Sequence, residues 1–83
     1  MEKEIGIITH YFDKVAVAVL KLSKELKVGD RIRIKGSATD FEQQVGSMQV
    51  ERKAIEVAKQ GDDVGLKVDE PVRSGDKVYL VLL

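Results

Sequence analysis

One short pattern occurs three times in the sequence, and it limits the chain to a small set of folds. A basic residue, any residue, glycine, aspartate, any residue and a β-branched residue follow one another at Lys27–Ile32, Lys59–Val64 and Arg73–Val78. Glycine reaches positive φ without steric cost, and an adjacent aspartate can accept hydrogen bonds from nearby backbone amides. Each copy therefore predicts a tight turn that leads directly into a β-strand.

After the first copy, apolar and charged residues alternate strictly. Ile32 and Ile34 fall on one face of the expected strand, and Arg31, Arg33 and Lys35 fall on the other, because successive strand side chains point in opposite directions. This pattern predicts a half-buried antiparallel strand with one face in water.

The remaining chain also favours short strands. We expect them at residues 4–10, 15–22, 30–35, 62–68 and 77–83, with a longer extended piece at 40–51 in which Gly46–Ser47 interrupts the alternation as a bulge. Residues 52–60 contain good helix formers and also alternate, so strand, turn and helix stay open there. Ile5 and Ile7 share one face of the first strand, and the inward set is predicted to be Val17, Ile32, Ile34, Leu66, Val78 and Leu80.

Glycine turns between short strands, without a long helix, favour an antiparallel barrel over a parallel sheet. We therefore expect one all-β domain over residues 1–83, a small antiparallel β-barrel that is closed or nearly closed.

Composition excludes several kinds of site. The chain has no cysteine and one histidine, His10, which is too few for a thiolate or histidine metal site or for a nucleophile–histidine set. No glycine-rich phosphate loop is present, so no nucleotide partner is predicted. We expect a non-enzymatic domain without a cofactor or a metal.

The apolar runs are short. The longest, Val15–Leu20, cannot span a bilayer, and the start Met1–Glu4 is unlike a signal peptide. We expect a cytoplasmic protein with no membrane partner.

Arg31, Arg33 and Lys35, joined by Arg52 and Lys53, form the candidate binding surface. Three cations two residues apart line about 13 Å of strand, a spacing suited to phosphates or to an acidic partner. The alternative is a solvated outer face that resists aggregation. We favour this alternative, because 14 basic and 14 acidic residues give no net charge.

The order of four motifs resembles the second domain of translational GTPases such as elongation factor Tu. The motifs are Lys27–Ile34, Val45–Met48, Ala58–Leu66 and Gly75–Val78, and together they span most of the chain. This resemblance implies a translation-protein type of barrel, here as a stand-alone domain. Its implied partners are tRNA, rRNA or a protein of the translation machinery.

The chain departs from that family at two places. Family members usually carry glycines in the second strand and before the first turn, where this chain has Ala18, Val19 and Ser23–Glu25. The C-terminal domain of collagenase-like peptidases, which the chain also resembles, lacks those glycines. This second resemblance implies, as the alternative, a protein-interaction module for a separately encoded peptidase-like protein.

Overall fold

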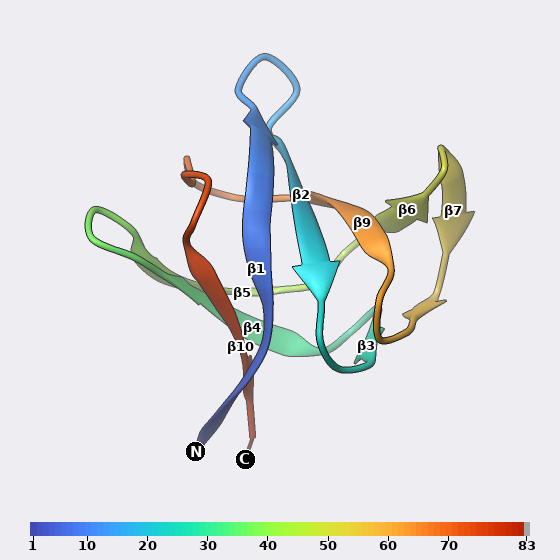
Figure 1. Ribbon diagram of the computed structural model, residues 1–83, viewed down its shortest axis with the longest axis horizontal. Coiled ribbons are helices and arrows are strands. Elements are labelled where there is room, and N and C mark those ends of the chain that lie inside the picture. Colours follow the sequence, from blue (N-terminus) through green and yellow to red (C-terminus); the bar gives the residue numbers. More distant parts are fainter. Residues whose placement is uncertain (83) are drawn as a thin grey trace.

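The computed structural model describes residues 1–82, which form ten β-strands and no helix (Figure 1). Eight strands form one antiparallel sheet in the order β5–β4–β10–β1–β2–β9–β6–β7, and β3 pairs with β8. The expected all-β antiparallel architecture is confirmed. The strands are β1 Glu2–Phe12, β2 Val17–Leu22, β3 Leu26–Lys27, β4 Arg31–Lys35, β5 Asp40–Gln44, β6 Met48–Val50, β7 Lys53–Ile55, β8 Val57–Ala58, β9 Asp63–Lys67 and β10 Lys77–Val81.

The described residues contain no helix that could cross a membrane.

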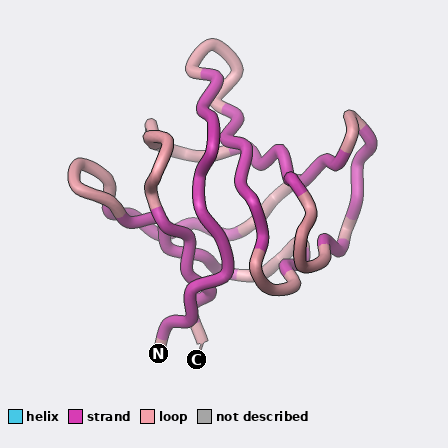
Figure 2. Tube along the Cα trace, viewed as in Figure 1, coloured by secondary structure: helices cyan, strands magenta, loops and turns pink. Residues whose placement is uncertain are grey.

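The sheet curves around the core but does not close on itself (Figures 1 and 2). Within residues 1–82, β5 and β7 are the two ends of the strand order and do not pair with each other. Between β5 and the end of β9, the buried side chain of Gln43 makes the connection: its Nε2 donates to the Lys67 carbonyl at 2.9 Å, and its Oε1 accepts from the Asp69 amide at 2.7 Å. A polar side chain thus links β5 to the end of β9 across this seam without a backbone ladder, and the expected closed barrel is not confirmed.

The three copies of the sequence pattern form three equivalent turns. Gly29, Gly61 and Gly75 have φ angles of 98°, 91° and 97°. In each turn the aspartate amide donates to the carbonyl of the basic residue at 3.0–3.1 Å, and the aspartate carboxylate accepts from the amide of the same residue at 2.9 Å. A positive φ at the third position with this backbone bond is the geometry of a type II turn.

Each turn also holds one buried residue from another part of the chain. The glycine amide donates to the carbonyl of that residue, and the amide of that residue donates back to the aspartate carbonyl, at 2.7–3.0 Å. We call this arrangement a Gly-Asp clamp. The clamps at Gly29, Gly61 and Gly75 hold Val45, Leu22 and Ile8, which are 1–2% exposed.

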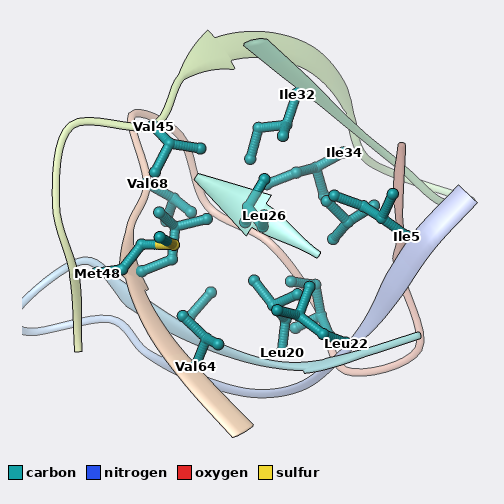
Figure 3. Packing of buried hydrophobic residues seen from close by; sticks show 14 of the residues in the cluster. Ile5, Leu20, Leu22, Leu26, Ile32, Ile34, Val45, Met48, Val64 and Val68 are labelled. Atoms are coloured by element: carbon teal, nitrogen blue, oxygen red, sulfur yellow. The ribbon is translucent and has the colours of Figure 1, made fainter. Parts of the chain in front are cut away.

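The core lies inside the curved sheet. Ile32, Ile34, Leu66 and Val78 are fully buried, as predicted, and Leu26 of β3 lies in the middle of the ring of core side chains (Figure 3). The pair β3–β8 was not predicted, because two-residue strands have no period to detect. The undecided stretch 52–60 contains strands β7 and β8, and Leu83, the end of the last expected strand, lies outside the described residues.

The facing of several apolar residues differs from the prediction. In β1 the register shifts between Glu4 and Gly6, so Ile5 and Ile8 are buried while Ile7 is exposed. In β2 the buried residues are Ala18, Leu20 and Leu22, and Val17 is half-buried. Both faces of β2 are apolar, so alternation could not identify the inner face. Leu80 packs only partly against the core.

Replacing Ile34 by Ala should lower the free energy of unfolding by about 2–5 kcal/mol, because the side chain is fully buried in β4. Ile34→Val removes one methylene and should cost about 0.5–1.5 kcal/mol. Urea unfolding measures both. A loss for Ile34→Ala no larger than that of Val57→Ala, whose side chain is exposed, would contradict the described packing.

Replacing Gly29, Gly61 or Gly75 by Ala should each cost about 1–3 kcal/mol, because a Cβ disfavours the positive φ of these turns. Steric crowding is not the cause, since no atom lies within 4 Å of the added Cβ. Gly46→Ala is the matched control: it has the same open space without the positive φ, so its effect should stay within about 0.5 kcal/mol. Equal stability of all four variants in thermal unfolding would show that the clamps do not need glycine.

Candidate functional site

The predicted basic row lies on the outer face of β4. Arg31, Arg33 and Lys35 point away from the core, because the buried Ile32 and Ile34 alternate with them. The sheet places β5 on one side of this row and β10, followed by β1, on the other.

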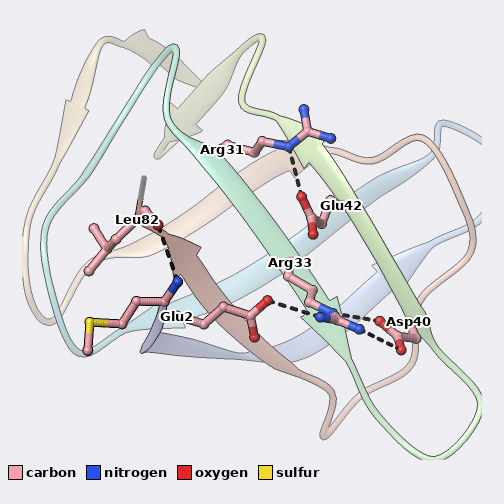
Figure 4. A network of polar contacts seen from close by, with 7 residues as sticks. Glu2, Arg31, Arg33, Asp40, Glu42 and Leu82 are labelled. Carbon is pink, nitrogen blue, oxygen red and sulfur yellow. Dashed lines mark hydrogen bonds and ion pairs between the residues drawn. The ribbon is translucent and has the colours of Figure 1, made fainter.

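Acidic side chains from the neighbouring strands pair with both arginines (Figure 4). Arg31 Nε lies 2.8 Å from Glu42 Oε1. Arg33 holds Asp40 with two bonds, Nε to Oδ1 at 2.7 Å and Nη2 to Oδ2 at 2.9 Å, and its Nη1 reaches Glu2 Oε2 at 3.1 Å. Two-pronged pairing of this kind fixes the plane of the guanidinium group. Because both arginines have acidic partners, the outer face of β4 and β5 carries alternating opposite charges rather than a continuous cationic strip. We call this face the charge mosaic.

The ion pairs shift the ionisation of their members. The hydrogen bond from Arg33 holds the pKa of Asp40 below its usual value, and the charges of Arg33 and Lys35 act in the same direction. The pKa of Arg33 is raised in turn, first by its hydrogen bond to Asp40 and then by the one to Glu2. Both groups therefore stay charged at neutral pH.

The other predicted site residues are divided between two places. Lys35 stands opposite Asp40 in the β4–β5 register, beside the arginines. Arg52 and Lys53 lie at the β6–β7 turn, at the far end of the strand order, and do not join the row (Figure 1). Their binding of a partner stays a prediction.

A shallow depression lies over the mosaic. It is open to solvent and is lined by Arg31, Arg33, Asp40, Phe41, Glu42 and Glu70. Because its two arginines already pair with Glu42 and Asp40, an anion that bound them would have to displace an internal partner.

The histidine and the paired aspartates of the sequence either hold turns or lie too far apart to form a catalytic or metal-binding group. His10 is exposed on β1, with Nδ1 3.2 Å from the Thr9 carbonyl. The Asp62 carboxylate accepts the Lys59 amide within its clamp, and Asp63 lies 3.8 Å from the Lys21 ammonium. Within residues 1–82, no group of three or more His, Cys, Asp or Glu side chains is placed to hold a metal ion.

Sequence reasoning missed two features of the surface and the seam. Gln43 appeared only as part of a broken alternation, although it bridges β5 and the end of β9. Phe12 was predicted in a loop and Val15 at the start of a strand, although both side chains are exposed at the β1–β2 hairpin and β2 begins only at Val17. Two large apolar residues on either side of Asp13–Lys14 were the available signal.

No family model matches the chain. It is 46% identical, over 79 residues and 94% of its length, to an uncharacterized protease of Methanocaldococcus jannaschii. It is 37% identical, over 71 residues and 83% of its length, to a collagenase of Porphyromonas gingivalis. The chain is thus similar in sequence to a segment of each of these two proteins. It spans about a fifth of the length of these relatives, 19% and 20% respectively.

Solved structures agree with this relationship at the level of the fold. The C-terminal domain of a Geobacillus thermoleovorans protein, assigned as a U32 peptidase, superposes with a TM-score of 0.91 over 96% of this chain at 17% identity. Its selenomethionine variant gives a TM-score of 0.87 over 92% of this chain.

The expected identity as a translation elongation factor-like domain is wrong. The related sequences are proteases, and the matching folds are C-terminal domains of a peptidase. Three of the four motifs that suggested a translation factor are the Gly-Asp turns and the strands that follow them, and the fourth begins at Val45, which the first clamp holds. These residues build the clamps and the core, so they specify a backbone arrangement and not a partner.

The Arg33–Asp40 pair predicts a pH dependence. A lowered folded-state pKa means that the pair stabilises the fold fully above the ordinary Asp pKa of about 3.9, and that this contribution is lost as pH falls through the lowered value. NMR titration of the Asp40 carboxyl carbon should show a midpoint below the ordinary value. Arg33→Ala should move it upward, and Lys24→Ala, on the distant β2–β3 connection, should not. An Asp40 titration midpoint that does not change in the Arg33→Ala variant would contradict the pairing.

Proposed function

We propose that this chain is a non-catalytic accessory β-domain that binds the polypeptide of a collagenase-like peptidase. The proposal rests on how much of each protein the sequence match covers. The match with the M. jannaschii protease takes in 94% of this chain but 19% of that protease. The shared unit is therefore a β-domain that accompanies a much larger polypeptide.

The use of the charged side chains supports a binding role rather than chemistry. Asp30 and Asp62 accept backbone amides in their clamps, and Asp40 and Glu42 pair with arginines. These carboxylates thus hold turns and ion pairs within the domain. General acid–base catalysis instead needs a carboxyl group that lies within hydrogen-bond reach of a substrate.

The peptidase portion is the partner that the comparisons favour. In the relatives, the matched segment and the remaining four-fifths belong to one polypeptide, which gives the two parts a high effective concentration for each other. Contacts between domains of one chain typically bury about 600–1,500 Å² and resemble transient protein–protein interfaces. We infer that this chain makes such a contact, in the same polypeptide as the peptidase or with a separate one.

A complex formed from two pieces tests the proposal. The M. jannaschii protease with its matched segment deleted should bind this chain one to one, with a dissociation constant of about 1–100 μM, as for interfaces of this size. Calorimetry and co-elution measure the complex. The intact protease is the control, because its own segment occupies the contact, and it should bind the added chain at least about tenfold more weakly. Absence of a complex with the truncated protease, or equal binding by both forms, would refute the proposal.

A further inference from the structure

Strand β5 leaves the longer of the two free edges of the sheet. Within residues 1–82, β5 and β7 end the strand order, and each has one neighbouring strand. β5 has five residues and β7 has three. A free edge presents a row of backbone amides and carbonyls, which is a template for one more strand.

The hydrogen bonds at both ends of β5 determine which of its backbone groups face the free edge. Thr39, just before β5, exchanges backbone bonds with Gly36 at 2.7 and 3.5 Å, and the Val45 amide, just after β5, donates to the Asp30 carbonyl at 2.8 Å. Bonded and non-bonded residue pairs alternate along an antiparallel ladder. The odd-numbered residues of β5 therefore bond to β4, and the even-numbered residues face outward. The outward backbone groups, which we call the β5 edge, are those of Asp40, Glu42 and Gln44.

Open space lies along the β5 edge. The shallow depression over the charge mosaic, of about 550 Å³, is lined by Asp40 and Glu42 on one side and by Glu70 on the other. A second depression, of about 190 Å³, lies between Gln44 and Lys67, the last residue of β9. Both depressions separate β5 from the chain at and after the end of β9, so a further strand has access to this edge.

Acidic side chains determine which strand fits the β5 edge. A second copy of the chain, paired about a two-fold axis at Glu42, would set carboxylate against carboxylate, and like charges directly opposite each other are destabilising. Opposite charges in the same positions are stabilising. Arg31 bonds to Oε1 of Glu42, and a carboxylate with two oxygens can accept a further donor. The edge therefore fits an extended segment with Lys or Arg at alternate positions.

The N-terminal end of the domain lies beside the charge mosaic. Arg33 Nη1 is 3.1 Å from Glu2 Oε2, and the same guanidinium group holds Asp40 of β5 (Figure 4). In the G. thermoleovorans protein the domain of this fold is C-terminal, so the rest of that protein precedes it. β1 and β5 are three places apart in the strand order, about 14 Å at the usual strand spacing, which about five extended residues can span. A polypeptide that precedes the domain therefore reaches the β5 edge through a short linker.

We propose that the β5 edge is the contact with the peptidase polypeptide, and that it binds an extended, basic segment of that polypeptide as an additional strand. This inference rests on the proposed function and identifies the surface that it requires. In strand addition, backbone hydrogen bonds give affinity and alternate side chains give specificity. The acids of the β5 edge then select the basic residues of the incoming strand.

Amide exchange with solvent, measured by NMR on the labelled and unaltered chain, tests the inference. The probe is the M. jannaschii protease with its matched segment deleted, at saturating concentration. The amides of Glu42 and Gln44 should exchange at least about tenfold more slowly in the complex, because they gain hydrogen bonds. The amides of Phe41 and Gln43 already bond to β4 and should change less. The intact protease is the control, because its own segment occupies the contact, and it should leave the pattern unchanged.

Two variants of one residue then separate the backbone bond from the side chain. Gln44→Pro removes an amide that the β4 ladder does not use, and it should weaken binding of the truncated protease at least about tenfold. Gln44→Ala keeps the amide and should change the affinity less than about twofold. Ala54→Pro, in the middle of β7, is the control for proline at a sheet edge and should also have less than about a twofold effect.

The basic character of the incoming strand has its own test. Glu70→Gln removes a charge beside the β5 edge and should weaken binding about two- to fivefold, as for an exposed ion pair. Glu51→Gln, at the β6–β7 turn, should leave the affinity unchanged. Equal affinities of the two variants would contradict a basic partner strand.

The outcomes distinguish this inference from the proposed function. No complex with the truncated protease would refute the proposed function. A complex in which all five β5 amides slow equally, or in which only amides elsewhere slow, would overturn the inference and leave the proposed function standing. Equal weakening by Gln44→Pro and Gln44→Ala would do the same. Slower exchange of the Glu42 and Gln44 amides as the concentration of the chain alone is raised would assign the edge to a second copy and also overturn the inference.

Discussion

The Gly-Asp clamp is the interaction on which the rest of this structure depends. Two backbone hydrogen bonds join each turn to a residue elsewhere in the chain: Gly75–Asp76 to Ile8 within β1, Gly61–Asp62 to Leu22 at the end of β2, and Gly29–Asp30 to Val45 after β5. The clamped residues are buried, and a buried amide or carbonyl without a partner would be costly. The clamps satisfy these groups at points where the chain turns sharply and ordinary ladders stop. They thereby let short strands curve around one core.

Much of this fold could be predicted because its determinants are local. Positive φ at Gly29, Gly61 and Gly75 and the aspartate bonds depend only on neighbouring residues, so the repeated pattern predicted the turns. Alternation predicted the burial of Ile32, Ile34, Leu66 and Val78. Prediction was wrong for Ile7, because a register shift in β1 reverses the facing, and that shift depends on how β1 meets β10. The open seam at Gln43 depends on two segments that are distant in sequence, so alternation could not reveal it.

The outer face of β4 likewise combines features that depend on neighbouring residues, which could be predicted, with contacts between distant segments, which could not. Alternation predicted that Arg31, Arg33 and Lys35 share an outer face. It could not predict their partners, because Glu42 and Asp40 meet the arginines through the β4–β5 register, and Glu2 arrives from a strand 31 residues away in sequence. The zero net charge of the chain did not indicate that the arginines of β4 and their acidic partners would be adjacent in the structure. The identity of the domain required comparison with other proteins, since turn motifs that build a backbone arrangement are compatible with many partners.

The seam at Gln43 gives this small domain an asymmetric pattern of local opening. Along most of the sheet, separating two strands breaks a row of backbone bonds, as between β1 and β2 or β1 and β10. Between β5 and the end of β9, the connection that must break is one glutamine side chain with its two bonds to the backbone. Local openings follow the least protected contacts, so we expect amide exchange and proteolytic access to be concentrated at this seam rather than around the clamps. We expect the domain to loosen along this one line while the strands on either side of it stay paired.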